Sequence, residues 1–385
     1  MMPDNTAEHG DEMREPEAPL SGQGERRLCV FIPTLTAGGA ERVASILANS
    51  WCAAGRVVVI TYFDEPHFYD LDPRVEVHCL GMRPNRGPVQ RNADILGAAM
   101  ALRRLARKIQ PDFVLSFMNK YNAFCLASFA GTGIPVIVSE RDSPFEPLPK
   151  LRVMARDTLY PYAAGLICQT ADGHAFMTER LSIRRAVVIP NPVARFLDPQ
   201  DRVPEQVILT VGRFIAKKAQ THLVTAFAAM KVPGWKLVLC GDGPQRKALE
   251  SQVSALGIAD RVEFAGTVSD LSPYFRRTGI FAFSSLFEGY PNALAEAMVS
   301  GLPCVSYDCP TGPAELIIDG ENGLLVPLAD IEALTAALDR LAGDAAFSAR
   351  LGARAALLAD KLAPENIAAD YLSFCDDAAR AKVAG

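Results

Sequence analysis

Short apolar runs alternate with helical patterns along most of this chain. Runs such as "LCVFIP", "RVVVITYF" and "DFVLSF" lie in the first half, and "VILTVG", "WKLVLCG" and "IFAFS" lie in the second. Uninterrupted apolar runs of this kind, separated by helices, are typical of parallel strands that helices cover on both faces. The alternation therefore predicts an α/β protein built on doubly wound parallel sheets.

The segment 191–206, "NPVARFLDPQDRVPEQ", interrupts the alternation with three prolines and mixed polarity, as expected of a connection between domains. We therefore predict two facing Rossmann-like domains, at residues 27–195 and 196–364. A last helical segment, residues 365–385, is a candidate to pack back on the first domain. Residues 1–26 are rich in Glu, Pro, Gly and Asp without apolar periodicity, which predicts a disordered tail.

Composition argues against several classes of protein. The formal charge of −5 argues against a nucleic-acid partner, which would require a basic surface. The nine cysteines are scattered and form no C-x-x-C pair, so we expect core thiols in a reducing compartment and no metal or disulfide framework. The chain shows no long apolar window and no signal-like N-terminus, which predicts a cytoplasmic protein.

The stretch 284–306, "SSLFEGYPNALAEAMVSGLPCVS", places a carboxylate on each side of a tight turn. Pro291 at the first helical position would leave N–H groups free to bind a phosphate, with the positive end of the helix dipole behind them. These N–H groups belong to Asn292, Ala293 and Leu294. Glu288 can then accept hydrogen bonds from a sugar, and Glu296 from a ribose. The alternative is an ordinary helix start with one exposed and one capping carboxylate.

Two further motifs follow predicted strands of the second domain, at the sheet edge where ligands bind in such folds. In "VGRFIAKKAQ", the cations Arg213 and Lys218 suit a diphosphate, although solvated surface cations are an equal alternative. In "CGDGPQRKAL", Gly241 and Gly243 form a tight turn that we expect to border a nucleotide, because Arg246 stands where a dinucleotide-binding motif has Gly or Ala.

The first domain supplies two motifs at the same edge. "LTAGGAERV" contains Gly38 and Gly39, which form either an anion or sugar cradle or a glycine turn that allows tight strand-to-helix packing. "VIVSERDSP" places Glu140 just after a strand. This carboxylate either orients an acceptor or is a solvated turn residue.

In these motifs the chain resembles the retaining GT-B glycosyltransferases that use nucleotide-sugar donors. The stretch "FEGYPNALAEAMVSGLPCVSYDCPTGPAEL" is similar to the two-glutamate signature of that family, and "GGAERV", "VGRFIAKK", "GDGP" and "ENGLLV" occur in the expected order. The resemblance spans about residues 27 to 380. It implies a GT-B fold and the transfer of a hexose or N-acetylhexosamine, with the variant "EGYPN" plus "CPTGP" pointing to uridine-diphosphate sugars and to polysaccharide or lipid-linked glycan assembly.

The resemblance also implies roles for individual residues. Arg213 and Lys218 would bind the donor diphosphate, Glu296 would hold the ribose, and Glu288 would contact the donor sugar. The backbone that would cradle sugar and phosphate runs through Gly289, Tyr290, Pro291, Asn292 and Ala293. Retaining enzymes of this type need no protein nucleophile, and cations replace the metal, so the resemblance implies neither a metal nor a further cofactor. The acidic tripeptide at 70–72 is therefore interpreted as a surface loop.

The chain departs from the family at two places. Ala219 stands where many members have glycine, and no histidine lies between His78 and His174, where many members have one near the donor sugar. Asn119 or Lys120 is a candidate to replace that histidine as a hydrogen-bond donor. The site can also work without it.

Residues 81–110 carry one acid, Asp94, and many cations. The cations are Arg83, Arg86, Arg91, Arg103, Arg104, Arg107 and Lys108. "LRRLARKI" combines them with apolar positions at helical spacing, which indicates either a helix on the anionic inner face of the cytoplasmic membrane or a solvated helix face. The membrane interpretation favours a lipid-linked acceptor. Two rival functions remain: a nucleotide-sugar epimerase of the same fold, and a non-catalytic partner of a second transferase.

Overall fold

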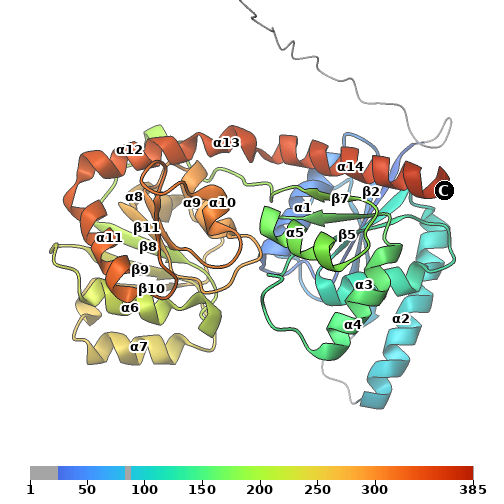
Figure 1. The fold of residues 1–385 in the computed structure, drawn as a ribbon, viewed down its shortest axis with the longest axis horizontal. Helices are drawn as coiled ribbons and strands as arrows, with labels where there is room; N and C mark the ends of the chain where they lie inside the picture. Colours follow the sequence, from blue (N-terminus) through green and yellow to red (C-terminus); the bar gives the residue numbers. More distant parts are fainter. Residues whose placement is uncertain (1–24, 83–87, 385) are drawn as a thin grey trace, which may run out of the picture.

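The computed structural model describes residues 25–82 and 88–384. The predicted tail therefore lies outside the described residues apart from Glu25 and Arg26, and so do Arg83 and Arg86 of the basic segment. Figure 1 shows two α/β lobes side by side, joined by the connection after β7 and by a line of C-terminal helices that runs across both. This arrangement confirms the predicted α/β fold with two parallel sheets.

The first lobe contains a parallel sheet of seven strands in the order β3-β2-β1-β4-β5-β6-β7. Its strands are β1 (Arg27–Ile32), β2 (Arg56–Phe63), β3 (Glu76–Met82), β4 (Phe113–Phe117), β5 (Val136–Ser139), β6 (Gly165–Cys168) and β7 (Ala186–Val188). Its helices are α1 (Gly39–Trp51), α2 (Pro88–Ile109), α3 (Asn119–Phe129), α4 (Lys150–Leu159), η1 (Tyr160–Tyr162) and α5 (Ala171–Arg180). The strand order reverses between β1 and β4, where doubly wound folds bind ligands.

The second lobe contains a parallel sheet of six strands in the order β10-β9-β8-β11-β12-β13. Its strands are β8 (Val207–Val211), β9 (Lys236–Cys240), β10 (Val262–Gly266), β11 (Ile280–Phe283), β12 (Cys304–Tyr307) and β13 (Leu324–Val326). The helical segments are η2 (Pro199–Asp201), η3 (Ala216–Lys218), α6 (Gln220–Ala228), α7 (Arg246–Ala255), η4 (Ala259–Arg261), α8 (Ser272–Arg277), α9 (Asn292–Val299), α10 (Pro313–Leu316), α11 (Ile331–Gly343), α12 (Ala345–Ala356) and α13 (Leu358–Lys361).

The continuous apolar runs are explained by burial on both faces of each sheet. In β1, Leu28 and Val30 belong to one hydrophobic cluster, whereas Cys29 and Phe31 belong to the cluster on the opposite face. Successive strand residues point to opposite faces, so a strand covered on both sides needs apolar residues at every position. This is why periodicity of two is absent from these runs.

Helix α14 (Pro364–Ala384) comes from the end of the chain and packs on the first lobe (Figure 1). Tyr371 and Cys375 are fully buried in the cluster that also contains Trp51. The Trp51 indole Nε1 donates a hydrogen bond to the Ala368 carbonyl at 2.9 Å. Helix α14 is therefore part of the first lobe's core, and it ties the two lobes together through α12 and α13.

Candidate functional site

The carboxyl ends of strands from both lobes meet where the lobes touch. The turn after β11 carries Gly289, and a Cβ atom at this position would lie 2.1 Å from the Arg141 carbonyl oxygen, just after β5. The two backbones are thus in direct contact, and only a residue without a side chain fits. The contact brings the predicted donor turn of the second lobe against the predicted acceptor edge of the first.

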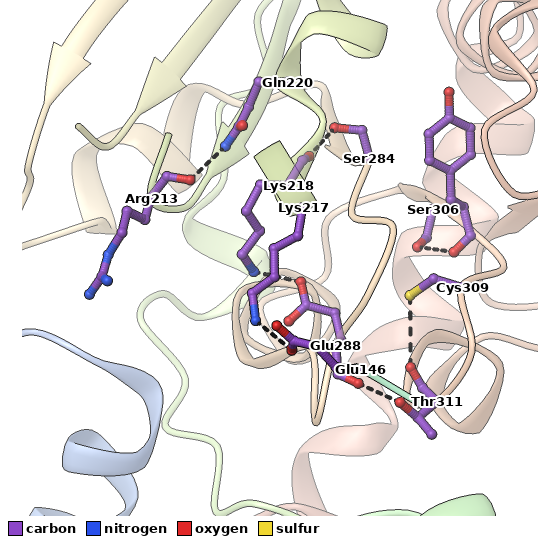
Figure 2. Close-up of polar contacts among 11 residues, drawn as sticks. Glu146, Arg213, Lys217, Lys218, Gln220, Ser284, Glu288, Ser306, Cys309 and Thr311 are labelled. Atoms are coloured by element: carbon purple, nitrogen blue, oxygen red, sulfur yellow. Dashed lines mark hydrogen bonds and ion pairs between the residues drawn. The ribbon is translucent and has the colours of Figure 1, made fainter. Parts of the chain in front are cut away.

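Lys218 and Glu288 form the central ion pair of this region (Figure 2). The Lys218 Nζ lies 2.5 Å from Glu288 Oε1, and the lysine also lies over the Phe283 ring, 5.2 Å from its centroid. The Glu288 side chain is about nine-tenths buried and the Lys218 side chain one-fifth exposed. Since Lys218 follows β8 and Glu288 follows β11, adjacent strands deliver the two charges to one point.

Neighbouring contacts hold this pair in place. The Ser284 hydroxyl donates to the Lys218 carbonyl at 2.9 Å, and the Leu286 N–H donates to the Lys217 carbonyl at 2.8 Å. The Lys217 ammonium pairs with Glu146 of the first lobe at 3.0 Å (Figure 2). The two adjacent lysines therefore have separate partners, one within the second lobe and one across to the first.

Arg213 takes a different place from Lys218. Figure 2 shows its guanidinium apart from the Lys218–Glu288 pair. Its carbonyl oxygen accepts a hydrogen bond from Gln220 Nε2 at 3.1 Å. The residue is exposed. Burial raises the pKa of the Glu41 carboxyl in the first lobe, and hydrogen bonds from its own backbone N–H and from Thr34, together with the Arg213 charge, partly oppose this. Arg213 is therefore close enough to Glu41 of α1 for the two charges to interact across the lobe boundary.

Glu296 is buried and pairs with a cation that the motif analysis did not assign. Arg42 of α1 donates from Nη1 to Glu296 Oε1 across the lobe boundary, and its guanidinium lies over the rings of Tyr69 and Phe196. Burial raises the pKa of the Glu296 carboxyl, and the Arg42 charge and hydrogen bond partly oppose this. The carboxylate predicted to hold a ribose is therefore occupied by an arginine of the opposite lobe.

Replacing Arg42 by alanine should lower the free energy of unfolding by about 1–3 kcal/mol near pH 8, since it leaves a buried carboxylate without its cation. The pKa of Glu296 would rise further, so the destabilisation should be largest above that pKa and should fade as the pH falls and the carboxyl is protonated. Urea unfolding at pH 5 and pH 8 measures this difference. In the double variant that also carries Glu296→Gln, the loss of unfolding free energy should be almost independent of pH. If the single variant lost the same free energy at pH 5 and at pH 8, the Arg42–Glu296 pairing would be contradicted.

The start of helix α9 differs in detail from the prediction. Pro291 is the N-cap, one position before the first helical residue, and the Asn292 N–H donates to the Tyr290 carbonyl at 3.0 Å. The expectation that the Asn292 N–H is free was therefore wrong, because the turn closes on itself. Among the described residues, the N–H groups of Ala293 and Leu294 have no hydrogen-bond partner. Two free donors remain for an anion at this helix start.

Side chains around the same helix start are also engaged. The Asn292 Oδ1 accepts from Asn191 Nδ2 of the interlobe connection at 2.6 Å, and a Cβ atom at Gly39 would lie 2.4 Å from Asn292 Nδ2. The Tyr290 side chain is buried, and so is that of Leu294. Of these three side chains, only that of Asn292 is not buried.

The other predicted glycines serve loop packing. A Cβ atom at Gly241 would lie 2.0 Å from the Gly212 carbonyl oxygen, and one at Gly243 would lie 2.6 Å from the Phe214 carbonyl oxygen. The "GDGP" turn is thus packed on the loop that carries Arg213. At Gly38 the neighbour is the carboxylate of Glu41 on the same helix start, at 2.1 Å.

On the acceptor side, Asn119 and Glu140 meet and Lys120 does not join them. Asn119 Nδ2 donates to Glu140 Oε2 at 3.2 Å, and both residues are buried. The Lys120 ammonium instead lies over the Tyr121 ring, 5.1 Å from its centroid. Glu140 is therefore no solvated turn carboxylate, and the solvated alternative was wrong.

Several contacting residues were not singled out from the sequence. Arg42 lies within the quoted motif "GGAERV", so its helix position next to Glu41 was a usable signal. Thr311 lies in the quoted "CPTGP" and Asn191 in the quoted connection 191–206, but neither motif indicated a partner. In the structure Asn191 bonds Asn292, and the Thr311 hydroxyl donates to the Glu288 carbonyl (Figure 2). Their partners come from distant parts of the chain.

Sequence comparison assigns both lobes to known families. Residues 38–192 match the family described as "Glycosyl transferase 4-like domain", and residues 205–344 match "Glycosyl transferases group 1". The chain belongs to the GT-B glycosyltransferases. The first matched segment of this glycosyltransferase contains β2 to β7, and the second contains β8 to β13 together with Arg213, Lys218, Glu288 and Glu296.

Relatives of this glycosyltransferase include two Campylobacter jejuni enzymes. One is the α-1,4-N-acetyl-D-galactosaminyltransferase named for GalNAc-α-(1→4)-GalNAc-α-(1→3)-diNAcBac-PP-undecaprenol, with 28% identity over 84% of this chain and 91% of the relative. The other is an N-acetylgalactosamine-N,N'-diacetylbacillosaminyl-diphospho-undecaprenol 4-α-N-acetylgalactosaminyltransferase, with 26% identity over 78% of this chain and 86% of the relative. The solved Anabaena protein HepE in complex with UDP-glucose has the same fold, with a TM-score of 0.75 and 20% identity over 90% of this chain and 99% of that chain.

Two further observations bear on the predictions. Within residues 25–82 and 88–384, no three His, Cys, Asp or Glu side chains are grouped so that they could hold a metal ion. The acidic tripeptide at 70–72 lies in an irregular segment, where Asp72 pairs with Arg74 at 2.8 Å. None of the helices in the described part of this glycosyltransferase is long and apolar enough to cross a bilayer.

Proposed function

We propose that this glycosyltransferase moves a hexose or N-acetylhexosamine from a uridine-diphosphate sugar to a glycan or lipid-linked acceptor, with retention of configuration at the anomeric carbon. The observation that carries the proposal is the Lys218–Glu288 ion pair on the turn that leads into α9, whose Ala293 and Leu294 N–H groups are free among the described residues. Such a group supplies positive charge for a diphosphate and a carboxylate for sugar hydroxyls.

In the proposed reaction the bond between the anomeric carbon and the diphosphate oxygen breaks. The acceptor hydroxyl oxygen forms the new bond on the same face of the sugar, and its proton passes to the departing phosphate oxygen. The negative charge grows on the diphosphate, so preorganised cations and N–H donors lower the barrier. Lys218, Arg213 and the start of α9 have that role here, and Glu288 orients the donor sugar.

Two ion pairs have to rearrange when the donor binds. Lys218 is held by Glu288 and Glu296 by Arg42. A diphosphate offers Lys218 a second anion, and a ribose offers Glu296 hydroxyl donors in place of Arg42. Each of these charges already has a partner within the protein, so no buried ion is left unpaired before the substrate binds.

The acceptor class is supported by the names of the relatives. Both Campylobacter jejuni enzymes are named for acceptors linked to undecaprenyl diphosphate. We therefore propose a lipid-linked glycan acceptor and a role in cell-surface polysaccharide or lipid-linked glycan assembly, in the cytoplasm at the inner face of the membrane.

The test is to incubate the protein with radiolabelled UDP-sugars and a bacterial membrane extract. Transfer of label to a lipid-soluble or polymeric product supports the proposal, and NMR of the product's anomeric carbon shows whether configuration is retained. Isomerised nucleotide sugar without transfer would indicate the epimerase, and no conversion of any UDP- or other nucleotide sugar would indicate the non-catalytic partner.

Chelation provides a separate prediction. Since Lys218, Arg213 and α9 neutralise the diphosphate in the proposed mechanism, excess EDTA should change the initial rate of transfer by less than about twofold. A loss of most activity on chelation, restored by Mn²⁺ or Mg²⁺, would contradict the metal-independent mechanism.

We also propose that the side of the first lobe that carries α2 and α4 contacts the anionic membrane. Helix α2 exposes Leu96 and Met100, and helix α4 exposes Leu151 and Met154 as well as the cations Lys150 and Arg152. Figure 1 shows α2 and α4 on the same side of this lobe. Exposed apolar side chains flanked by cations are typical of a helix face that lies on anionic lipid.

Vesicle sedimentation tests this surface. Leu151→Glu with Met154→Glu should reduce binding to phosphatidylglycerol-containing vesicles by about tenfold or more, because two apolar side chains that enter the interface become charged. The matched control is Leu357→Glu in the second lobe, where the leucine is equally exposed; it should bind like the wild type. Equal binding by all three proteins would contradict the proposal.

A further inference from the structure

The carboxyl group of Glu140 is buried at the carboxyl end of β5 with one oxygen bonded and the other free. Glu140 is 5% exposed. Its Oε2 accepts a hydrogen bond from the Tyr160 hydroxyl at 2.8 Å and one from Asn119 Nδ2 at 3.2 Å. Its Oε1 is buried and has no hydrogen-bond partner among the described residues. A buried carboxylate oxygen without a donor is costly, so such an atom calls for an explanation.

A small cavity at the contact between the lobes adjoins this carboxyl group. Glu140, Asp142 and Gln169 line it from the first lobe, and Gly289 lines it from the second. Gly289 directly follows Glu288, and its backbone touches the carbonyl of Arg141, which directly follows Glu140. Glu140 therefore faces, across the touching backbones, the turn that carries the proposed donor-sugar ligand.

No cation in the described residues forms an ion pair with Glu140. Arg141, the next residue, bonds Asn191 and Tyr371 instead, and Arg156 of α4 bonds Asp157. The carboxyl group is thus held by two neutral donors, which fix its orientation, and no ion pair neutralises its charge. A structural role alone would be served by a neutral side chain at lower cost.

We propose that Glu140 is an acceptor-binding residue: its free Oε1 accepts a hydrogen bond from a non-reacting hydroxyl of the acceptor sugar, while Tyr160 and Asn119 hold the carboxylate in position. The inference rests on the proposed transfer function and names the subsite that receives the acceptor. The attacking hydroxyl gives its proton to the departing phosphate, so Glu140 takes no proton in the reaction. In this proposal Asn119, a candidate to replace the missing family histidine, does not contact the substrate but positions Glu140.

The surroundings of Glu140 make this contact sensitive to pH. Burial raises the pKa of Glu140 to about 7, the nearby charge of Asp142 adds to the effect, and the hydrogen bonds from Tyr160 and Asn119 and the charge of Arg156 oppose it. The other ionisable groups facing Glu140 are Arg141 on the same segment and Cys168 on β6, whose own pKa is raised to about 12. The carboxylate accepts hydrogen bonds through both oxygens, whereas the protonated form does not, so acceptor binding should weaken as pH falls below about 7.

The experiment uses the membrane-extract assay, with the extract diluted to give an apparent acceptor KM at saturating donor. Glu140→Gln keeps an oxygen for Tyr160 and Asn119 but presents an amide N–H₂ to the cavity. It should raise the acceptor KM about tenfold at pH 8, which is typical for a lost hydrogen bond to a charged group, with the donor KM and thermal stability unchanged. In the wild type the acceptor KM should rise below about pH 7, and in the variant this rise should disappear.

Tyr160→Phe separates binding from structure. It removes one hydrogen-bond donor that stabilises the carboxylate, so the pKa of Glu140 should rise. The pH below which the acceptor KM increases should therefore be higher than in the wild type, whereas the acceptor KM at pH 9 should stay near the wild-type value. An acceptor KM that is the same in Glu140→Gln as in the wild type at every pH, in an assay where the wild type transfers sugar, would overturn this inference and leave the proposed function intact. Absence of transfer by the wild type would instead refute the proposed function.

Discussion

Replacing Lys218 by alanine should reduce the turnover number by about two to three orders of magnitude, with little change in the melting temperature. Lys218 lies 2.5 Å from Glu288 at the point where the diphosphate is proposed to leave. Removing one group that stabilises a developing negative charge typically costs this much in rate. Removing the lysine also leaves the Glu288 carboxylate, which is about nine-tenths buried, without its cation. The free energy of unfolding should therefore fall by about 1–3 kcal/mol, a change of a few degrees in melting temperature that is small beside the loss of rate.

Lys217→Ala is the matched control for that result. Lys217 is the adjacent lysine, and it pairs with Glu146 across the lobes instead of with Glu288. Its removal should change the turnover number by no more than a few fold, as expected for a half-exposed ion pair. Steady-state kinetics with thermal melting decide the case. Equal loss of rate in both variants, or a fall in melting temperature that parallels the fall in rate for Lys218→Ala, would point to a structural lysine.

Gly289→Ala should reduce kcat/KM by about a hundredfold. The added Cβ would lie 2.1 Å from the Arg141 carbonyl oxygen, so the two backbones have to separate by more than an ångström. A displacement of about that size between reacting groups can cost about a hundredfold in rate. The expected loss concerns the alignment of donor and acceptor, because the turn also carries Glu288 and borders Glu140.

Gly97→Ala provides the control for that substitution. Gly97 lies within α2, where a Cβ atom would meet nothing within 4 Å. This variant should keep the wild-type kcat/KM and be slightly more stable, since alanine favours a helix. If Gly289→Ala kept wild-type kinetics as well, the close contact between the lobes would not be part of the working enzyme.

The fold was predictable because its signals are local. A strand that helices cover on both faces is apolar at every position in any parallel sheet, so β1 and β8 could be recognised from their own residues. The donor motif was assigned from its resemblance to the family, and the structure adds that Lys218 and Glu288 follow the adjacent strands β8 and β11, whose carboxyl ends share one edge.

Contacts between the lobes could not be predicted in the same way. Arg42 and Glu296 are 254 residues apart, and Asn191 and Asn292 are 101 apart. Their pairing depends on how the lobes face each other, which no local pattern records. The buried state of Glu140 likewise depends on Tyr160, which reaches it from η1.

The sequence analysis also did not predict the left-handed backbone angles of two residues beside the site. Ala219 adopts a left-handed conformation with φ 45° directly after Lys218, at the position where the resemblance led us to note the absence of a glycine. Met118, with φ 73°, precedes Asn119 where the family histidine is missing. Non-glycine residues rarely adopt such angles, so the positions of Lys218 and Asn119 are held by the surrounding structure against local preference.

Calorimetric titration of UDP and of uridine into the wild type and Lys218→Ala, with EDTA present, tests the central claim that protein cations and the start of α9 hold the diphosphate. We expect the wild type to bind UDP about a hundredfold or more tightly than uridine, and Lys218→Ala to retain no more than about a tenth of that preference, with uridine affinity unchanged. Equal affinity of the wild type for UDP and uridine, or an undiminished preference in Lys218→Ala, would contradict the claim.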